Sequence, residues 1–472
     1  MRALKWVING CYVVALLPSS WGAVPVPPNV RVSGHLWNIQ NEEQVWICPA
    51  DTNIVVTNHR DFRLGFRQIA IARSTDGGAN WTDGLISPAF QNFKLQSDPA
   101  MTVTSEGDFV IAYLDFANAE SPDDDSSFIT ILKTADHGQT WEGPYTVVDT
   151  IGAYLEDKVF ITSDRTGGKY DGSVYASWVR HPNPSHLMFA RSPDGGVTWG
   201  DPVVVGRPTY SGCFSDSISS GLFSQPLVGQ DGAVYVFWQS FWQAPPSSCR
   251  IYSVLRMNKS SDGGVTWEGE RILKAFVGAG IIEGNVDTYN QPVTDADISE
   301  GPHGGNLYLQ HVDNTDRPPF HEEIWFQRSL DTGHTWSPPI RVNDDSLGPE
   351  VDQFHNWMVC NEDGILVSIW YDQRTDPAHY KFDVFAAYSY DGGSSWTSNH
   401  RVSSVSIDPL LLATNAQPQA RGILPAGIEN SLTPNAPMAG KIAEYIGVAC
   451  SHDKVVAVWT DSRDGDQDVW SA

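Results

Sequence analysis

The sequence predicts an all-β protein built from a repeated sheet unit, and three observations support this. An eight-residue pattern, Ser/Thr-x-Asp-x-Gly-x-x-Trp, occurs six times at nearly regular spacing along the 472 residues. Each copy follows an alternating segment typical of a half-buried strand. The chain contains 41 Gly, 30 Pro and 18 Trp, a composition typical of short strands joined by tight turns. Long helical periodicity is nearly absent, which argues against a helical fold.

The eight-residue pattern has the chemistry of a tight turn. Its Ser and Asp side chains can accept hydrogen bonds from nearby backbone N–H groups, and its Gly can adopt the positive φ that such a turn requires. The Trp can fold back over the hairpin and bury its ring against the sheet. The six copies are Ser74–Trp81, Thr134–Trp141, Ser192–Trp199, Ser260–Trp267, Ser329–Trp336 and Ser389–Trp396.

These motifs resemble Asp boxes, also called BNR repeats, and the sequence resembles the sialidase-like β-propeller family over nearly all of residues 24–472. The resemblance implies four-stranded antiparallel blades arranged around a central channel. In such propellers the boxes lie on the face away from the substrate. The box Asp residues are therefore expected to be structural.

The number of blades is predicted from the second strand of each. Seven candidate second strands occur, and the last is followed by a third strand without a box. Residues Asn29–Ser33 resemble a fourth strand, so we expect them to complete the last blade and close a seven-bladed ring; the six-bladed sialidase fold is the alternative. The seven segments are Asn53–Arg60, Asp108–Phe116, Gly172–Arg180, Ala233–Ser240, Asn306–Asn314, Ile365–Arg374 and Val455–Asp464.

The N-terminus has the pattern of a secretory signal. Arg2 and Lys5 precede a mostly apolar run, Trp6–Leu17, and small residues follow up to Ala23. Such a segment is typically removed on export. We therefore expect residues 1–23 to be a signal peptide, residues 24–472 to form a single propeller domain, and the mature protein to be secreted.

Charge and motifs limit the expected partners. The chain has 30 Lys and Arg against 56 Asp and Glu, a formal net charge of −26, which argues against nucleic-acid and anionic-membrane partners. Phosphate-binding loops and zinc-spaced Cys/His clusters are absent from the sequence, so no cofactor and no metal is expected. The carboxylates of Asp461–Asp468 could hold Ca²⁺ but fit a solvated hairpin better.

The cysteines are expected to divide into two groups. Cys213 and Cys249 lie in loops at the same end of neighbouring blades and are expected to form a disulfide. Cys48, Cys360 and Cys450 lie on innermost strands and are expected to be buried thiols, with a pair from blades 7 and 1 as the alternative.

The candidate site lies where innermost strands begin and second strands end. Arg60, Arg374 and Arg463 follow second strands on blades 1, 6 and 7, and guanidinium groups bind carboxylates well. The resemblance to sialidases implies three arginines on the sugar carboxylate and a Tyr nucleophile assisted by Glu. Tyr371 or Tyr445, with Glu444, could fill the latter role, and Asp98 could be the acid.

Three functions remain open from the sequence. The first is an exo-sialidase-like glycoside hydrolase acting on an acidic sugar or glycan. The second is a polysaccharide lyase acting on uronates, for which His355, Tyr371 and Tyr445 are candidate bases and acids, with Arg374 neutralising the carboxylate. The third is a glycan-binding propeller without catalysis, since a fold does not define a function.

Overall fold

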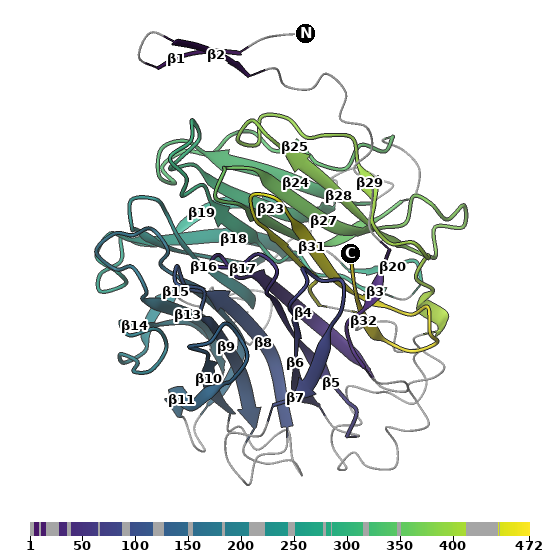
Figure 1. The fold of residues 1–472 in the computed structure, drawn as a ribbon, viewed down its shortest axis with the longest axis horizontal. Helices are drawn as coiled ribbons and strands as arrows, with labels where there is room; N and C mark the ends of the chain where they lie inside the picture. Colours follow the sequence, from purple (N-terminus) through teal and green to yellow (C-terminus); the bar gives the residue numbers. More distant parts are fainter. Residues whose placement is uncertain are drawn as a thin grey trace.

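Seven antiparallel sheets of four strands each form a ring in the computed structural model (Figure 1). The structure describes residues 4–8, 11–15, 28–34, 39–64, 67–86, 95–116, 127–149, 154–181, 185–206, 222–243, 251–276, 280–284, 286–314, 321–346, 351–411, 442 and 444–472. The prediction of an all-β, seven-bladed propeller is confirmed.

Each blade runs from an innermost strand at the channel to an outer strand at the rim. Blades 1 to 3 are β4–β7 (Gln40–Ile47, Val55–Asp61, Gln68–Ser74, Thr82–Leu85), β8–β11 (Leu95–Val103, Phe109–Phe116, Ser127–Lys133, Glu142–Asp149) and β12–β15 (Leu155–Ser163, Val174–His181, His186–Ser192, Val203–Gly206). Blades 4 to 6 are β16–β19 (Leu222–Val228, Val234–Gln243, Ile251–Ser260, Arg271–Phe276), β22–β25 (Val293–Ala296, Leu307–Asn314, Glu322–Ser329, Ile340–Arg341) and β26–β29 (Gln353–Cys360, Leu366–Asp372, Asp383–Ser389, His400–Arg401).

Blade 7 is assembled from both ends of the described chain. Its order is β30 (Gly447–Cys450), β31 (Val455–Asp461), β32 (Asp468–Ser471) and β3 (Val30–Arg31). Val30 pairs with Ser471 and Arg31 with Trp470. The expected closing strand is therefore confirmed, and the six-bladed alternative is wrong.

The box turns have the hydrogen bonding expected from their sequence. In the first, Ser74 Oγ donates to Asp76 Oδ1 at 2.8 Å, and Asp76 Oδ1 also accepts the Asn80 N–H at 2.8 Å. The Gly78 N–H donates to Ser74 Oγ, and its φ of 95° places it in the region that favours glycine. These hydrogen bonds hold the pKa of Asp76 below its ordinary value, which fits a structural carboxylate.

Five innermost strands share an irregularity that matters for the site. In β4, β8, β12, β16 and β26 the pairing with the second strand shifts register near the strand's start. Such a bulge turns one residue out of the ladder and re-aims its side chain. The residue at the bulge has a positive φ in each case, and the five are Glu42, Asp98, Lys158, Phe223 and His355.

Two hairpins lie outside the blades. One is β20 (Ile281–Ile282) with β21 (Val286–Asp287), and the other is β1 (Leu4–Ile8) with β2 (Cys11–Ala15). Figure 1 shows the second hairpin apart from the ring. Cleavage of residues 1–23 as a signal stays a prediction.

Cys48, Cys360 and Cys450 are free thiols. Cys48 is buried, as expected, whereas Cys360 and Cys450 are half-buried. The expected Cys213–Cys249 disulfide lies outside the described residues. Among the described residues, no helix has the length and apolar character needed to cross a membrane.

Candidate functional site

Seven side chains, one from each blade, line one level of the central channel. Five come from the bulges just described. Non-glycine residues with positive φ are uncommon, and five at matching places indicate a repeated device that aims side chains inward. Blades 5 and 7 contribute Tyr289 and Tyr445, which contact the bulge residues. We call these seven the axial ring: Glu42, Asp98, Lys158, Phe223, Tyr289, His355 and Tyr445.

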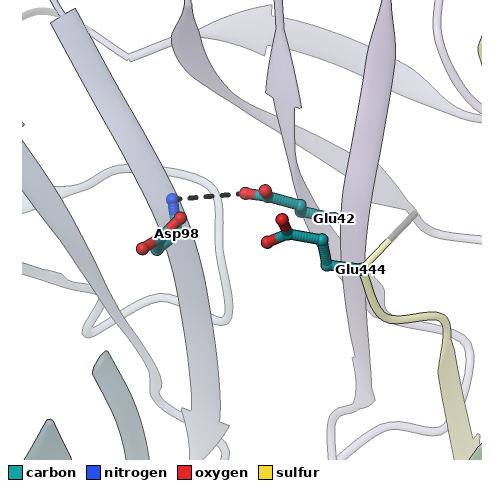
Figure 2. A group of neighbouring side chains, drawn as sticks. All are labelled: Glu42, Asp98 and Glu444. Carbon is teal, nitrogen blue, oxygen red and sulfur yellow. Dashed lines mark hydrogen bonds between the residues drawn. The ribbon is translucent and has the colours of Figure 1, made fainter. Parts of the chain in front are cut away.

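One half of the axial ring is charged, and Lys158 lies at its centre. Its Nζ is 3.3 Å from Asp98 Oδ1 and 4.0 Å from Glu42 Oε1, and it forms an ion pair with Glu444. Figure 2 shows Glu42 and Glu444 reaching toward Asp98, whose backbone N–H donates to Glu42 Oε2 at 3.3 Å. One ammonium group therefore holds three carboxylates from blades 1, 2 and 7 together.

Arg60 supplies the second positive charge. It lies on β5, and its Nη1 is 2.8 Å from Glu42 Oε1. Its Nε donates to Asn41 Oδ1 at 2.9 Å. The side chain is nearly buried, so this ion pair is little screened by water. We call Glu42, Asp98, Glu444, Lys158 and Arg60 the charged cluster.

The carboxyl groups of this cluster differ in proton affinity. Burial raises the pKa of Glu42 to about 7, against the lowering effect of Arg60 and Lys158. Burial would also raise the pKa of Asp98, but Lys158 and Arg60 outweigh it and hold that pKa below its ordinary value. Burial is thus the main reason why Glu42 can retain a proton near neutral pH, and the neighbouring charges of Asp98 and Glu444 act in the same direction.

The other half of the axial ring is aromatic. The Phe223 and Tyr289 rings are 5.3 Å apart, and the Tyr289 and His355 rings stack at 5.7 Å. Lys158 Nζ lies 5.8 Å from the centre of the Phe223 ring and 5.7 Å from that of Tyr445. The site therefore combines a charged face with aromatic surfaces of the kind that line ligand pockets.

The charged cluster has carboxylates in a metal-like arrangement. One oxygen each from Glu42, Asp98 and Glu444 lies within 4.8 Å of the others. The Lys158 ammonium group already contacts all three of these carboxylates. The cluster thus contains its own cation, and its geometry is explained without a metal ion.

Of the residues selected from the sequence, the structure brings Asp98, Glu444, Tyr445 and Arg60 together. Tyr445 is 1% exposed, and burial together with Glu42 raises its pKa well above the ordinary value. His355 lies on the aromatic side of the axial ring. The expectation that Arg374 and Arg463 converge with Arg60 is wrong.

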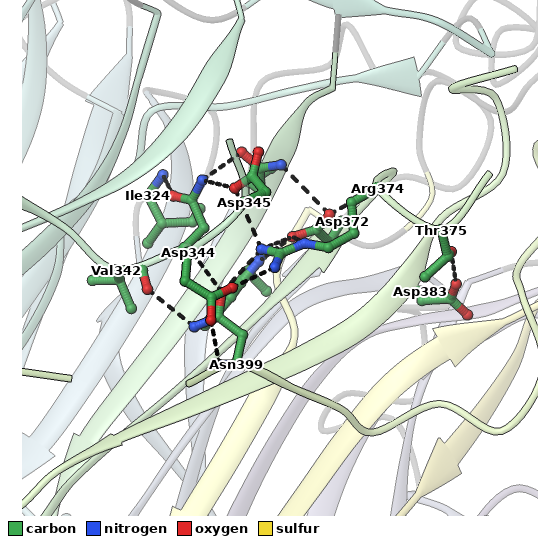
Figure 3. A network of polar contacts seen from close by, with 12 residues as sticks. Ile324, Val342, Asp344, Asp345, Asp372, Arg374, Thr375, Asp383 and Asn399 are labelled. Atoms are coloured by element: carbon green, nitrogen blue, oxygen red, sulfur yellow. Dashed lines mark hydrogen bonds and ion pairs between the residues drawn. The ribbon is translucent and has the colours of Figure 1, made fainter. Parts of the chain in front are cut away.

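Arg374 belongs to a separate network at the edge of blade 6 (Figure 3). Its Nε donates to Asp372 Oδ2 at 2.9 Å, and its Nη1 donates to Asp344 Oδ1 at 2.6 Å. Its Nη2 donates to Asn399 Oδ1, and the guanidinium group stacks 4.6 Å from the Phe385 ring centre. With these partners, Arg374 ties strands of blades 5 and 6 together.

Arg463 repeats this arrangement on blade 7. Its backbone N–H donates to Asp461 Oδ1 at 2.9 Å, its Nη2 contacts Asp461 Oδ2 at 2.6 Å, and it stacks 4.1 Å from the Trp470 ring centre. On blade 1 the residue bonded in this way to Asp61 is Arg63. Matching Arg60 with Arg374 and Arg463 was therefore a misalignment by three residues.

Tyr371 is a core residue. Its hydroxyl donates to Thr460 O at 3.2 Å and accepts the Thr460 N–H at 3.1 Å, which joins blades 6 and 7. Burial raises its pKa well above the ordinary value. The His355 and Tyr371 rings do lie together, with centres 6.3 Å apart, but the Tyr371 hydroxyl is bonded to the Thr460 backbone. Arg374 belongs to the network at the edge of blade 6, so the complete lyase set of His355, Tyr371, Tyr445 and Arg374 is not assembled.

Sequence reasoning did not select Lys158, Phe223 or Tyr289, and it placed Glu42 at this mouth without giving it a role. An alignment of the innermost strands would have revealed three of them, since Glu42, Lys158 and Phe223 each stand two residues before the position where regular pairing resumes. In β4, for example, Gln44 is the first paired residue after the bulge at Glu42.

Solved structures share this architecture at low sequence identity. The α-L-arabinofuranosidase of Fusarium graminearum, in complex with an iminosugar inhibitor, is 12% identical, with a TM-score of 0.51 over 76% of this chain and 97% of that chain. The α-L-arabinanase of Penicillium chrysogenum is 12% identical, with a TM-score of 0.46 over 74% of this chain and 94% of that one. The Hadza microbial sialidase Hz136 is 14% identical, with a TM-score of 0.45 over 70% of this chain and 63% of that one.

No protein-family model and no curated protein matches the sequence. The structural likeness to the α-L-arabinofuranosidase establishes the fold, a β-propeller. The resemblance expected from the sequence is thus confirmed at the level of the fold.

Proposed function

We propose that the protein is a glycoside hydrolase whose reaction takes place at the charged cluster. The observation that carries this proposal is a set of three carboxyl groups within 4.8 Å of one another, in which one pKa is raised and another lowered. Glycoside hydrolysis needs such a pair: one carboxylic acid to protonate the leaving oxygen and one carboxylate to act at the anomeric carbon.

Glu42 and Asp98 suit these two roles. With a pKa of about 7, Glu42 holds a proton at mildly acidic pH and can act as the general acid. Asp98 stays ionised and can act as the nucleophile. A separation of about 5 Å is typical of retaining enzymes, whereas inverting enzymes leave room for a water molecule between carboxyl groups about 6.5–9.5 Å apart. We therefore propose retention of configuration.

The charges favour a neutral sugar over an acidic one. In the described part of the site, Lys158 and Arg60 are both bonded to carboxylates of the cluster. A sugar carboxylate would add a further negative charge beside these three carboxylates, with Arg67 as the further cation that interacts with Glu42 and Asp98. The acidic glycan expected from the sequence is retained as the alternative for testing.

Tyr445 offers a second route to the same reaction. Its pKa is affected by Glu42 more than by any other charged group, which suits a Tyr nucleophile with Glu42 as its base. Sialidases use such a pair, so this route would support the acidic-sugar alternative. The two routes differ in which residue forms the covalent intermediate.

The test compares Glu42→Gln, Asp98→Asn and Tyr445→Phe in hydrolysis of aryl glycosides. We expect the Glu42 variant to lose about 10²–10⁴-fold in rate and the Asp98 variant to lose at least as much. Added azide should restore product formation in Asp98→Asn, because a small anion can attack the anomeric carbon in place of the carboxylate. Asp115→Asn is the matched control, since Asp115 is also a buried carboxyl group with a pKa raised to about 6 but is bonded to Gln96 and Thr130.

The substrate panel separates the alternatives. It should contain an α-L-arabinofuranoside, a sialoside and a uronate polymer. Turnover of neutral glycosides supports the proposal. Turnover of the sialoside with loss of activity in Tyr445→Phe would replace it with the sialidase route. Near-ultraviolet absorbance from the uronate polymer would indicate a lyase. Binding without turnover in the wild type would overturn the enzymatic proposal.

The pH profile gives a further check. Since Glu42 must be protonated to act as the acid, the rate should fall as the pH rises above about 7. Arg60 lowers the pKa of Glu42, so Arg60→Met should move this alkaline limb to higher pH.

A further inference from the structure

The central channel continues past the axial ring toward the face that has the box turns. A cavity of about 70 Å³ lies at this next level, and residues from all seven blades line it. In β4, for example, Gln44 of the cavity wall stands two residues after Glu42 of the axial ring. The Phe160 ring, which also lines the cavity, meets Tyr445 of the axial ring edge-on at 5.5 Å. The cavity shares no residue with the charged cluster.

Arg165 brings a positive charge to the cavity. It follows β12 of blade 3, and its guanidinium group lies over the Trp46 ring of blade 1, 4.7 Å from the ring centre. Among the residues that the structure describes, none forms a hydrogen bond or an ion pair with Arg165. Burial lowers its pKa below the ordinary value, and the carboxylates of Asp295 and Glu362 oppose this effect. A half-buried guanidinium group whose donors lack protein partners favours an anionic acceptor.

Two glutamine side chains add further donors to the cavity wall. Gln44 Oε1 accepts the Met101 N–H at 2.7 Å, and Gln225 Oε1 accepts the Thr294 N–H at 2.8 Å, so each oxygen ties its blade to the next. The Nε2 group of Gln44 is buried without a partner among the described residues, and Gln225 Nε2 likewise donates to none of them. Gln44 and Gln225 are only 5% and 6% exposed. Because a buried amide without a partner costs free energy, a bound acceptor would stabilise both groups.

One carboxyl group, that of Asp295, also lines the cavity. Its Oδ2 accepts the Cys360 N–H at 2.7 Å, and its Oδ1 accepts the Ala296 N–H at 2.8 Å. Burial raises the pKa of Asp295 to about 6; Asp297 acts in the same direction, whereas Arg165 and the two backbone hydrogen bonds lower it. Burial also raises the pKa of the Cys360 thiol well above its ordinary value, so this thiol is neutral. Below pH about 6, Asp295 is neutral as well, and the positive charge of Arg165 is no longer opposed by it.

We propose that this cavity binds one small carboxylate, of about the size of formate or acetate, through Arg165 and the amides of Gln44 and Gln225. The planar fork of a guanidinium group matches a carboxylate with two parallel hydrogen bonds. The volume is about twice the ~30 Å³ that one water molecule takes in the liquid, which leaves room for a short carboxylate and not for a sugar ring. The site is therefore separate from the glycoside-hydrolase site proposed above.

The test is titration of the full chain with ¹³C-formate, followed by NMR line broadening. We expect saturable binding in the wild type. Arg165→Met should weaken it at least about tenfold, because the charge-assisted bidentate contact is lost. Arg191→Met is the matched control. Arg191 also belongs to blade 3 and lies 4.5 Å from the centre of the Tyr170 ring, but it does not line the cavity, so formate binding should be unchanged.

A second variant keeps the proposal testable if Arg165→Met does not fold. Arg165→Lys retains the positive charge but not the planar fork, and it should weaken formate binding about three- to tenfold. Equal affinity for formate in the wild type and in the folded Arg165 variants would overturn the proposal. Absence of saturable formate binding in the wild type would overturn it too.

The pH dependence and a second anion sharpen the test. Formate stays ionised at pH 5.5 and at pH 7.5, so the loss of charge on Asp295 should make binding tighter at the lower pH. Asp295→Asn should remove most of this difference, because Glu362 and Asp297 remain as the other acids near Arg165 and Asp295. Inorganic phosphate forms the other arm. Saturable binding of phosphate without binding of formate would indicate a site for a tetrahedral anion and would overturn the carboxylate proposal.

Discussion

Arg60 and Arg374 both follow a second strand and both bind carboxylates, yet they belong to different kinds of structure. Arg60 points to the channel and joins a cluster with residues from four blades. Arg374 is held by Asp372 of its own strand, by Asp344 and Asn399 nearby, and by the face of Phe385. Arg463 has the same kind of local partners.

The difference shows that the role of an arginine depends on where its partner carboxylate lies: in the same turn, or on another strand that faces the channel. The Asp two residues before Arg374 or Arg463 accepts both the backbone N–H and the guanidinium group of the Arg, and also the indole N–H of Trp370 or Trp459. This leaves a local turn with its polar groups satisfied. The residue two positions before Arg60 is Asn58 and not Asp. The Arg60 guanidinium group therefore pairs with Glu42 in the channel.

The largest effect should come from the centre of the charged cluster. Lys158→Met should lower the free energy of unfolding at pH 7 by about 3–5 kcal/mol, because it leaves buried carboxylates without their cation. The loss should be smaller at pH 5, where those carboxylates can take up protons. Urea denaturation at both pH values measures it.

Lys169→Met is the control for this prediction, since Lys169 is exposed. It should change stability by no more than about 0.5 kcal/mol. Equal losses in the two variants would mean that Lys158 does not hold the cluster together.

The next effect distinguishes the two regions by pH. Burial raises the pKa of Glu43 to about 8, above its unfolded value, so its contribution to stability is full below pH about 4.5 and is lost as the pH rises through 8. The Thr460 hydroxyl donates a hydrogen bond to Glu43 Oε1; Glu43→Gln keeps this acceptor and removes the titration. At pH 8 the variant should be more stable than the wild type by about 2–4 kcal/mol, and near pH 4.5 the two should match.

Asp344→Asn provides the contrasting measurement at the edge of blade 6. Although burial opposes it, hydrogen bonds from Asn399 and Arg374 hold the pKa of Asp344 below its ordinary value. Its contribution is therefore present above that value and constant between pH 5 and 8. A stability difference that changes over this range would contradict the comparison.

Arg374→Met should lower the free energy of unfolding by about 2–3 kcal/mol, because charge-assisted hydrogen bonds to Asp372 and Asp344 are lost. Activity per folded molecule should stay unchanged. Thermal melts and hydrolysis rates on the same sample measure both. A lower hydrolysis rate with an unchanged free energy of unfolding would contradict this structural role and indicate that Arg374 acts in the active site.

The smallest effect is expected for Arg463→Lys, at about 1 kcal/mol. Lysine keeps the charge but cannot reproduce the two contacts with Asp461 while stacking on Trp470. Chemical denaturation should resolve this difference from the wild type. A variant as unstable as Arg463→Met would show that the charge contributes nothing without the planar group.

The sequence predicted the fold well because the fold is repeated. Six copies of one turn and seven candidate second strands predicted the number of blades. Asn29–Ser33 matched the fourth strand that the last blade lacked. Asp98, Glu444 and Tyr445 were found because residues at the start of innermost strands face the channel. Lys158 was overlooked because only arginines were considered as carboxylate-binding residues. It occupies the same position on β12 as Asp98 does on β8.

The bulges explain what the sequence could not reveal. A shift of one residue in a strand moves side chains to the other face, and no residue type marks where the shift occurs in β4, β8 or β12. The arginines were misplaced for a related reason. Arg60 was matched with Arg374 and Arg463 by its position after the second strand, whereas the structure aligns the strand ends at Asp61, Asp372 and Asp461.

The pairing of β3 with β32 sets the order in which the ring can be completed. Ser471 Oγ donates to Val30 O across 441 positions of the chain. Closing a loop of this length carries an entropy penalty of about 5 kcal/mol, and contacts so distant in sequence slow folding. During synthesis β3 stays unpaired until β32 has been made, and until the two strands meet β32 presents an open edge. A second molecule in the same state could supply its own β3 to that edge, so newly made chains are most exposed to exchange of strands just before they close.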